Sequence, residues 1–197
     1  MASNVYFDPN FDIEAVKIVP GEYCATSGSK LIVTVLGSCV AACISDCRNG
    51  IGGMNHFMLP NIPDRGKPTM AFAHSGIVAM ENLINQLLLM GAQRQNLEAK
   101  VFGGGNILNC FNTANAGASS SKFLHEYLAA EKIPIVGKDV LDIYPRKVYF
   151  FPDTGRALVK KLRKLHNETI IQREHEYAIR LGLLGGEVSG NGSGKAN

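Results

Sequence analysis

Cys39 and His56 are the residues whose types and surroundings best suit catalysis in this 197-residue chain. Cys39 follows Gly37 and Ser38 at the end of an apolar run, where small residues let the backbone turn tightly and point N–H groups toward the thiol. Such N–H groups could hold an oxyanion. A thiol is mostly protonated near neutral pH and needs a base beside it, usually a histidine. Either residue alone is more often a packing residue, so on residue type and position the two are candidates for a nucleophile and its base.

Three runs predict the strands that would carry this pair. They are residues 31–36, which are apolar and rich in β-branched side chains, residues 40–45 and residues 53–59. If the second and third form a hairpin, a four-residue loop over residues 46–49 places Cys39 directly opposite His56. A tighter turn at residues 49–50 instead pairs His56 with Cys43. Cys39 then lies roughly 13 Å along the strand, at ~3.3 Å per residue. Both registers keep the three side chains on one face, and the sequence does not choose between them.

Strands and helices alternate over the rest of the chain. Helices are predicted at residues 75–90, 121–131 and from about residue 156 onward. Further strands are predicted at residues 97–102, 133–136 and 146–151. Ser75 and Gly91 would cap the first helix, and Pro134 indicates an edge strand because it lacks an N–H group. The last helix is predicted from the spacing of Leu158, Leu162 and Leu165. This alternation predicts a single domain with an α/β (α+β) layered sandwich fold.

The sequence divides into four predicted parts: a weakly patterned N-terminal extension (residues 1–19), a catalytic domain (20–165), a C-terminal helical extension (166–184) and a disordered tail (185–197). A hydrophobic content of 46% with 19% charged residues suits one buried core under a polar surface. We find no long apolar run and no basic, apolar leader, so we expect a cytoplasmic protein that does not insert into a membrane.

Composition also narrows the partners and cofactors. A formal net charge of +3 is too small to indicate nucleic-acid binding. Five cysteines, an odd number without a secretion signal, favour reduced thiols over disulfides. Cys39, Cys43, Cys47 and His56 could in principle bind zinc. Their spacing argues against this, because Cys39 and Cys43 lie at opposite ends of a predicted strand rather than on turns. We therefore expect no metal and no cofactor.

Two further motifs are interpreted as turns. Residues 153–155, Asp-Thr-Gly, spell the triplet of aspartic proteases, but those sites need two carboxylates and only one copy is present. We interpret this triplet as the turn into the last helix. Residues 103–106, Gly-Gly-Gly-Asn, lack the spacing of phosphate-binding loops and predict a tight turn near the active site.

Two blocks around the cysteine and the histidine resemble the signature of CheD-type chemoreceptor glutamine deamidases of bacterial and archaeal chemotaxis. They are residues 36–40 (LGSCV) and 52–60 (GGMNHFMLP). Residues 100–104 (KVFGG) and 146–156 (RKVYFFPDTGR) are similar to later blocks of the same family. The matches run in order over roughly residues 20–165, which makes the resemblance specific.

The resemblance implies a Cys-His hydrolase with Cys39 as nucleophile and His56 as its base. A threonine upstream of the cysteine is the third member in such enzymes, and here it is Thr34, which would orient His56 through its hydroxyl. Backbone N–H groups near Ser38 to Val40 would support the oxyanion. The resemblance also implies an α/β sandwich similar to the catalytic domain of cytotoxic necrotizing factor toxins.

The activity implied by this resemblance is that of a protein-glutamine glutaminase, a hydrolase of side-chain carboxamide C–N bonds. It would convert glutamine side chains of methyl-accepting chemotaxis receptors to glutamate and release ammonia, through a thioester. The implied partners are the cytoplasmic helical region of those receptors and a CheC-type phosphatase. The alternative is a chemotaxis adaptor that binds a receptor or that phosphatase with little catalysis.

Overall fold

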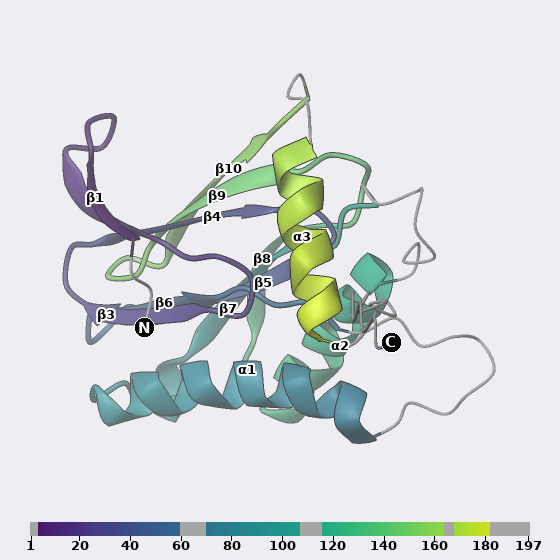
Figure 1. Cartoon of the computed structure of the whole chain (residues 1–197). Helices are drawn as coiled ribbons and strands as arrows, with labels where there is room; N and C mark the ends of the chain where they lie inside the picture. The colour runs from purple at the N-terminus through teal and green to yellow at the C-terminus, as the bar shows by residue number, and fades with distance from the viewer. Residues whose placement is uncertain (1–3, 60–69, 107–115, 164–167, 182–197) are drawn as a thin grey trace, which may run out of the picture.

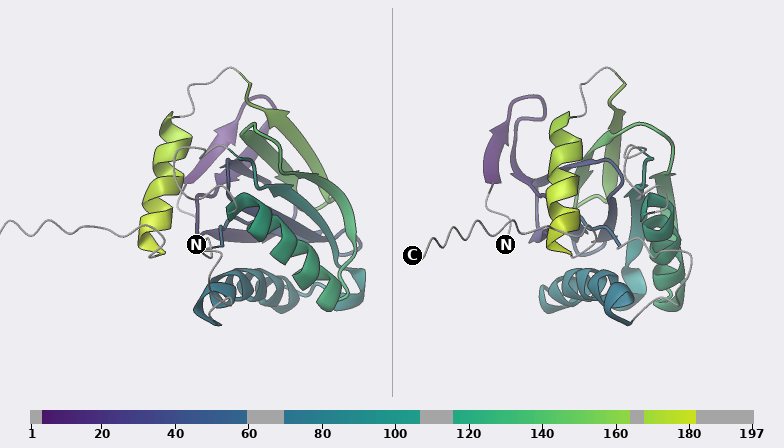
Figure 2. Two further views of the ribbon diagram at one scale, coloured as in Figure 1. Left: turned by 90° about the vertical axis from the view of Figure 1, so that its right-hand side faces the viewer. Right: turned by 45° about the vertical axis from the view of Figure 1, so that its right-hand side comes forward.

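The chain forms two five-stranded sheets that pack face to face, with two helices on the outer face of one sheet and a third helix across one end (Figure 1, Figure 2). The computed structural model describes residues 4–59, 70–106, 116–163 and 168–181. This arrangement is a single α+β domain, in agreement with the fold class predicted from the sequence.

The first sheet has the strand order β1-β2-β4-β9-β10. Its strands are β1 (Asn4–Asp8), β2 (Ile13–Lys17), β4 (Leu31–Leu36), β9 (Arg146–Phe151) and β10 (Arg156–Lys161). Neighbouring strands are antiparallel except β2 and β4, which run parallel.

The second sheet has the order β3-β6-β5-β7-β8. Its strands are β3 (Tyr23–Ser27), β6 (Ile51–Asn55), β5 (Val40–Asp46), β7 (Glu98–Gly103) and β8 (Ile135–Val140). Only β7 and β8 are parallel neighbours. The helices are α1 (Met70–Leu89), the short 3-10 helix η1 (Arg94–Asn96), α2 (Ala116–Ala130) and α3 (Glu168–Arg180).

Strand β5 is buried on both faces because it lies between the first sheet and the helices. Ala41 and Cys43 point into the core between the two sheets, which they share with Phe150 of β9. Ala42 and Ile44 point the other way, into the core beneath α1 and α2. A strand covered on both sides reads as a continuous apolar run, which is why residues 40–45 show no polar alternation.

The chain crosses from the first sheet to the second at residues 37–39. Strand β4 ends at Leu36 in one sheet, and β5 begins at Val40 in the other. The backbone of the crossing segment cannot continue the ladder of either sheet. Its N–H groups therefore need partners from elsewhere in the molecule.

A glycine turn after β7 holds the crossing segment in place. The Gly104 N–H donates to the Cys39 carbonyl at 2.8 Å, and the Gly105 N–H donates to the Gly37 carbonyl at 2.7 Å. Gly103 has a φ of +103°, and a Cβ atom there would lie 2.2 Å from the Cys39 oxygen. The tight turn predicted for residues 103–106 is confirmed, and its close approach to Cys39 leaves no room for a side chain.

Arg146 of β9 supports the same turn from the first sheet. Its side chain is fully buried and donates to the carbonyl groups of Gly103, at 2.6 Å, and Asp139, at 3.1 Å. It also donates to the Leu141 carbonyl and forms an ion pair with Asp139 at 3.5 Å. A buried cation must be paired, and here backbone oxygens of the second sheet supply most of the pairing.

Most predicted elements are confirmed. The strands predicted at residues 31–36, 40–45, 97–102 and 146–151 are β4, β5, β7 and β9. The strand with Pro134 corresponds to β8, which does lie at an edge of its sheet. The predicted helices at 75–90 and 121–131 are α1 and α2, although both begin earlier, at Met70 and Ala116. Gly91 ends α1 with a φ of +102° and an N–H bond to Leu88, as expected of a C-cap.

Two local predictions were wrong. Ser75 does not cap α1 but lies inside it, because the good helix formers Ala71 and Ala73 extend the helix to Met70. The strand predicted at 53–59 is shorter, since β6 ends at Asn55 and only Phe57 makes a further isolated bridge.

The helix predicted from residue 156 was also wrong, since residues 156–161 form strand β10. The Asp-Thr-Gly triplet at 153–155 is the turn of a β9–β10 hairpin rather than a turn into a helix, and Gly155 has a φ of +64°. Ala157 and Val159, two residues apart, pack on the core between the sheets. Pairing with β9 therefore outweighs the helical spacing of Leu158 and Leu162.

Residues 4–17, predicted to be a weakly patterned extension, form β1 and β2 of the first sheet. β2 pairs with β4, and its Ala15 and Val16 are buried. The C-terminal helical extension contains α3. Leu165 and the predicted disordered tail at 185–197 lie outside the described residues. Within the described ranges, no helix is long and apolar enough to span a bilayer.

We expect substitution of Gly103 by alanine to destabilise the fold more than the same change at Gly28. Both glycines have positive φ values, +103° and +93°, but a Cβ at Gly28 meets nothing within 4 Å. Gly28→Ala should cost about 1 kcal/mol of unfolding free energy through backbone strain alone. Gly103→Ala should cost about 1–3 kcal/mol more because it overpacks the Cys39 segment. Urea unfolding of both variants measures the difference, and equal losses would contradict the packing described here.

Candidate active site

The hairpin of β5 and β6 has a register that lies between the two predicted from the sequence. Cys43 pairs with Met54, and Val40 forms a bridge with Phe57. His56 therefore lies opposite neither Cys39 nor Cys43, and both predicted registers were wrong. The shift from each is an even number of residues, so the side chains keep the face that was predicted for them.

Asp46 sets this register. Its Oδ1 accepts the N–H groups of Arg48, at 3.1 Å, and Asn49, at 3.2 Å, and its Oδ2 accepts the Asn49 side-chain amide at 2.6 Å. These bonds close the turn just after β5 ends, and Gly50, with a φ of +63°, completes it. The loop accordingly spans residues 47–50 rather than 46–49 or 49–50.

Cys39 and His56 come together between the two sheets at the end where the chain crosses. Both side chains are buried, and a thiol sulfur, an imidazole nitrogen and a carboxylate oxygen of Cys39, His56 and Glu174 all lie within 4.8 Å of one another. The geometry thus brings the two predicted residues into one site. It adds Glu174, which the sequence analysis did not single out.

Thr34 reaches this site from the first sheet. Its Oγ1 donates to the Ile18 carbonyl at 2.9 Å and lies 2.8 Å from His56 Nδ1. A hydroxyl has one proton, and a carbonyl oxygen can only accept it. Because that proton is used on Ile18, His56 Nδ1 must carry the hydrogen of the second bond. The neutral imidazole is therefore held as the tautomer with a free lone pair on Nε2.

The free nitrogen of His56 is deeply buried. Nε2 has no hydrogen-bond partner among the described residues. Burial lowers the pKa of His56 from 6.5 to about 3, since the charged form cannot be solvated there. In this state the imidazole is a neutral base with its acceptor nitrogen unused.

Three backbone N–H groups of the crossing segment converge on the carboxylate of Glu174 in α3. Oε1 accepts from Gly37 at 2.9 Å and from Cys39 at 3.0 Å. Oε2 accepts from the Ser38 N–H at 2.8 Å and from the Ser38 hydroxyl at 2.5 Å. The segment is thus an anion-binding nest of the kind that holds oxyanions in acyl-transfer enzymes.

The backbone of Val40, predicted as part of this oxyanion support, does not contribute a donor. Its N–H donates to the Phe57 carbonyl at 2.8 Å because β5 has already begun its pairing at that residue. The donors available are those of Gly37, Ser38 and Cys39. Ser38 therefore remains in the candidate set, whereas Val40 is replaced by Gly37 and Cys39.

The thiol of Cys39 is held in its neutral form. Burial raises its pKa well above the usual value, and the charge of Glu174 and a hydrogen bond to it raise the pKa further. The nearby Cys43 thiol is also fully buried, which raises its pKa, and it lies farther along β5. With a neutral imidazole and a neutral thiol, the site has the composition of a resting Cys-His pair.

Cys39, His56 and Glu174 also have the donor types of a metal site. Both oxygens of Glu174, however, already accept hydrogen bonds from the crossing segment. Only a thiol and an imidazole are then left, fewer protein ligands than zinc usually takes. Cys47, part of the zinc set weighed from the sequence, lies exposed in the β5–β6 loop. The arrangement favours acid–base and nucleophilic chemistry over metal binding.

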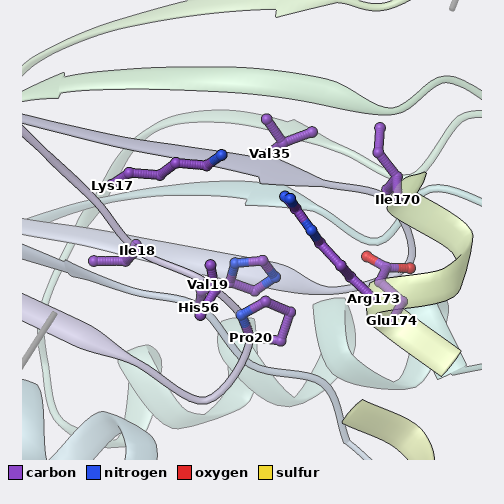
Figure 3. Close-up of a pocket in the computed structure, with 9 residues that line it drawn as sticks. All are labelled: Lys17, Ile18, Val19, Pro20, Val35, His56, Ile170, Arg173 and Glu174. Carbon is purple, nitrogen blue, oxygen red and sulfur yellow. The ribbon is translucent and has the colours of Figure 1, made fainter. Parts of the chain in front are cut away.

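A small pocket leads from the surface to His56 along the edge of α3 (Figure 3). It is lined by Lys17, Ile18, Val19, Pro20, Val35, His56, Ile170, Arg173 and Glu174. With α3 in place the pocket has room for about 20 Å³ of solvent, which is close to a single water molecule.

Comparisons with known proteins agree with the chemistry of this site. Residues 58–161 match the family described as CheD chemotactic sensory transduction. A protein of Thiobacillus denitrificans named "Probable chemoreceptor glutamine deamidase CheD" is 58% identical over 191 residues, covering 95% of both chains. Similar proteins of Methylobacillus flagellatus (57% over 192 residues, 95% of both chains) and Dechloromonas aromatica (55% over 181 residues, 92% and 90%) carry the names "Probable chemoreceptor glutamine deamidase CheD" and "Probable chemoreceptor glutamine deamidase CheD 1".

The buried neutral His56 should make the fold less stable in acid. In the unfolded chain the imidazole takes up a proton below about pH 6.5, but in the folded chain it does so only near pH 3. The contribution of the neutral His56 imidazole to the free energy of unfolding is therefore complete above pH 6.5. It is lost as the pH falls toward 3, at about 1.4 kcal/mol per pH unit. Urea unfolding of the wild type and of His56→Gln at several pH values in this window isolates the contribution of His56 to the free energy of unfolding. Equal pH slopes for the two proteins would show that His56 is not held neutral.

Proposed function

Because the chain belongs to the CheD family, we propose that it is a protein-glutamine deamidase acting on chemoreceptors. The relatives at 50–58% identity carry the name of a chemoreceptor glutamine deamidase. The enzyme would hydrolyse the side-chain carboxamide of glutamine in methyl-accepting chemotaxis receptors to glutamate and ammonia. The observation that carries this proposal is the arrangement of Thr34, His56 and Cys39. It leaves the lone pair of His56 Nε2 free, and a nitrogen of the same ring lies within 4.8 Å of the Cys39 sulfur.

The reaction would begin with proton transfer from Cys39 to His56. Nε2 takes the thiol proton, and the thiolate attacks the Cδ atom of the substrate glutamine. The carboxamide oxygen becomes an oxyanion, and the N–H groups of Gly37, Ser38 and Cys39 stabilise it. These donors are fixed in advance by the glycine turn at 103–105, so they need not reorganise during the reaction.

The tetrahedral intermediate would then collapse to a thioester. The imidazolium of His56 donates its proton to the departing nitrogen, and ammonia leaves as the C–N bond breaks. A water molecule, deprotonated by the same imidazole, attacks the acyl carbon and breaks the C–S bond. The products are a glutamate side chain and the regenerated Cys39 thiol.

Thr34 has a positioning role in this proposal. It does not touch the reacting atoms, but its hydroxyl fixes the tautomer and the orientation of the imidazole.

The proposal also includes the resemblance to cytotoxic necrotizing factor toxins and the CheC-type phosphatase partner. The layered sandwich of two sheets supports the first.

Cys39→Ala should abolish deamidation, because no other described thiol lies beside His56. The purified protein is incubated with the cytoplasmic fragment of a chemoreceptor, and mass spectrometry follows the replacement of NH₂ by OH at receptor glutamines. We expect conversion with the wild type and none above background with Cys39→Ala. Cys43→Ala is the matched control, a buried cysteine on the same face of β5, and should retain activity. Conversion by Cys39→Ala would refute the assigned nucleophile.

Thr34→Val should lower kcat by roughly 10²- to 10⁴-fold, the range expected when a general base loses its orienting partner. Thr34→Ser keeps the hydroxyl and should recover most of the rate. KM should change little in either variant, since Thr34 is buried away from the surface. If Thr34→Val and Thr34→Ser were equally slow, the role of Thr34 would be packing rather than the hydrogen bond to His56.

A further inference from the structure

Helix α3 covers the candidate active site with one face. Glu174 and Ala178 on this face are each only 1% exposed, and Ile170 and Arg173 line the pocket that leads to His56. Tyr177 packs against the backbone at Gly21, where a Cβ atom would approach its ring to 2.9 Å. The left-hand view of Figure 2 shows α3 standing beside the two sheets, apart from α1 and α2. The described contacts of the helix therefore include the site itself and the adjoining edge of the core between the sheets.

The chemistry of Glu174 matches the product of the proposed reaction. A glutamate side chain is what a glutamine becomes when it is deamidated. Its carboxylate lies on the N–H groups of Gly37, Ser38 and Cys39, where the carboxamide oxygen of a substrate would have to lie. One of its oxygens is within 4.8 Å of the Cys39 sulfur.

We infer that α3 occupies the substrate site as an internal product analogue, with Glu174 in the place of the converted residue. This inference rests on the proposed deamidase function. The substrate is then a helical segment that presents one glutamine from an amphipathic face, and it binds where α3 now lies. Deamidation of a receptor requires α3 to leave, so the helix keeps the enzyme inactive until a receptor helix displaces it.

The charges around α3 favour its displacement. Arg173 extends from the helix toward Lys17 of β2 (Figure 3), and both line a second cavity together with Lys147 of β9. The positive charges of Arg173 and Lys147 add to burial in lowering the pKa of Lys17. α3 therefore places a cation in a cationic groove. A substrate helix with an acidic residue at the position of Arg173 would complement the groove better than α3 does.

Two features of the covered site agree with an inactive state. The pocket beside His56 has room for about one water molecule and cannot admit a glutamine side chain while α3 is in place. The charge of Glu174 contributes to the raised pKa of Cys39. Departure of α3 would open the site and remove an anion from the thiol in a single step.

The full-length variant Glu174→Gln tests the inference directly, because it presents a glutamine to Cys39 within one molecule. The thiolate forms an S–C bond with the Cδ atom of the introduced glutamine, the C–N bond breaks, and ammonia leaves with the proton that His56 received from the thiol. Water then adds its OH to the acyl carbon, the C–S bond breaks, and the remaining proton of that water passes through His56 to the sulfur. We expect the introduced glutamine to revert to glutamate at a rate that does not depend on protein concentration, as mass spectrometry of the peptide would show.

Controls lie on the same helix. Gln172 and the variant Glu176→Gln present exposed glutamines within two residues of position 174, and neither should convert. The double variant Cys39→Ala, Glu174→Gln should keep its introduced glutamine. If the glutamine of Glu174→Gln stays intact in an enzyme that deamidates receptor glutamines, α3 does not occupy the substrate site and the inference fails. If neither this glutamine nor any receptor glutamine is converted, the proposed function itself fails.

A second measurement uses Glu174→Ala, which removes the product analogue. Alkylation of Cys39 by iodoacetamide, followed by peptide mass spectrometry, should be roughly tenfold faster or more than in the wild type. Receptor deamidation should accelerate as well, and Glu176→Ala should change neither rate. If Glu174 were only a structural cap, Glu174→Ala would instead lower deamidation and the unfolding temperature. Slower deamidation with unchanged alkylation would overturn the inference.

Discussion

The site depends on three backbone N–H groups that no strand can use. They arise because β4 and β5 belong to different sheets and the chain must cross between them at Gly37, Ser38 and Cys39. Buried N–H groups need acceptors, so an anion or a polarised oxygen must lie beside the crossing segment. The glycine turn at 103–105 and Arg146 behind it keep these donors aligned. The proposed oxyanion site is therefore a result of how two sheets are joined.

The protonation states follow from burial at the same place. A low-dielectric interior keeps both Cys39 and His56 neutral, and Thr34 decides which imidazole nitrogen carries the hydrogen. The resting state therefore contains no ion pair between a Cys39 thiolate and a His56 imidazolium. In the proposed mechanism the reactivity of Cys39 depends instead on what covers it, since the carboxylate of Glu174 and the exclusion of solvent both favour the thiol over the thiolate.

Sequence patterns predicted the parts of the site that are close together along the chain. Cys39 and His56 lie on one short hairpin, and period-two alternation placed them on one face whatever the register. The register itself depended on Asp46, whose side chain closes the turn in a way that apolar patterning does not reveal. Glu174 lies far along the sequence on a polar helix and has no local signal. β10 was predicted as a helix because Leu158 and Leu162 fit both periods, and pairing with β9 decided between them.

The three proposed catalytic residues belong to three separate pieces of the sandwich. Thr34 is in the first sheet, His56 follows a strand of the second, and Cys39 is on the connection between them. The spacing between the sheets, set by side chains such as Ile32, Met54 and Phe150, is therefore also the length that sets the Thr34–His56 bond. The apolar core acts as a spacer for the chemistry. A change of side-chain volume in this core would alter the Thr34–His56 distance, and with it the position of the imidazole, without changing any residue that contacts the substrate.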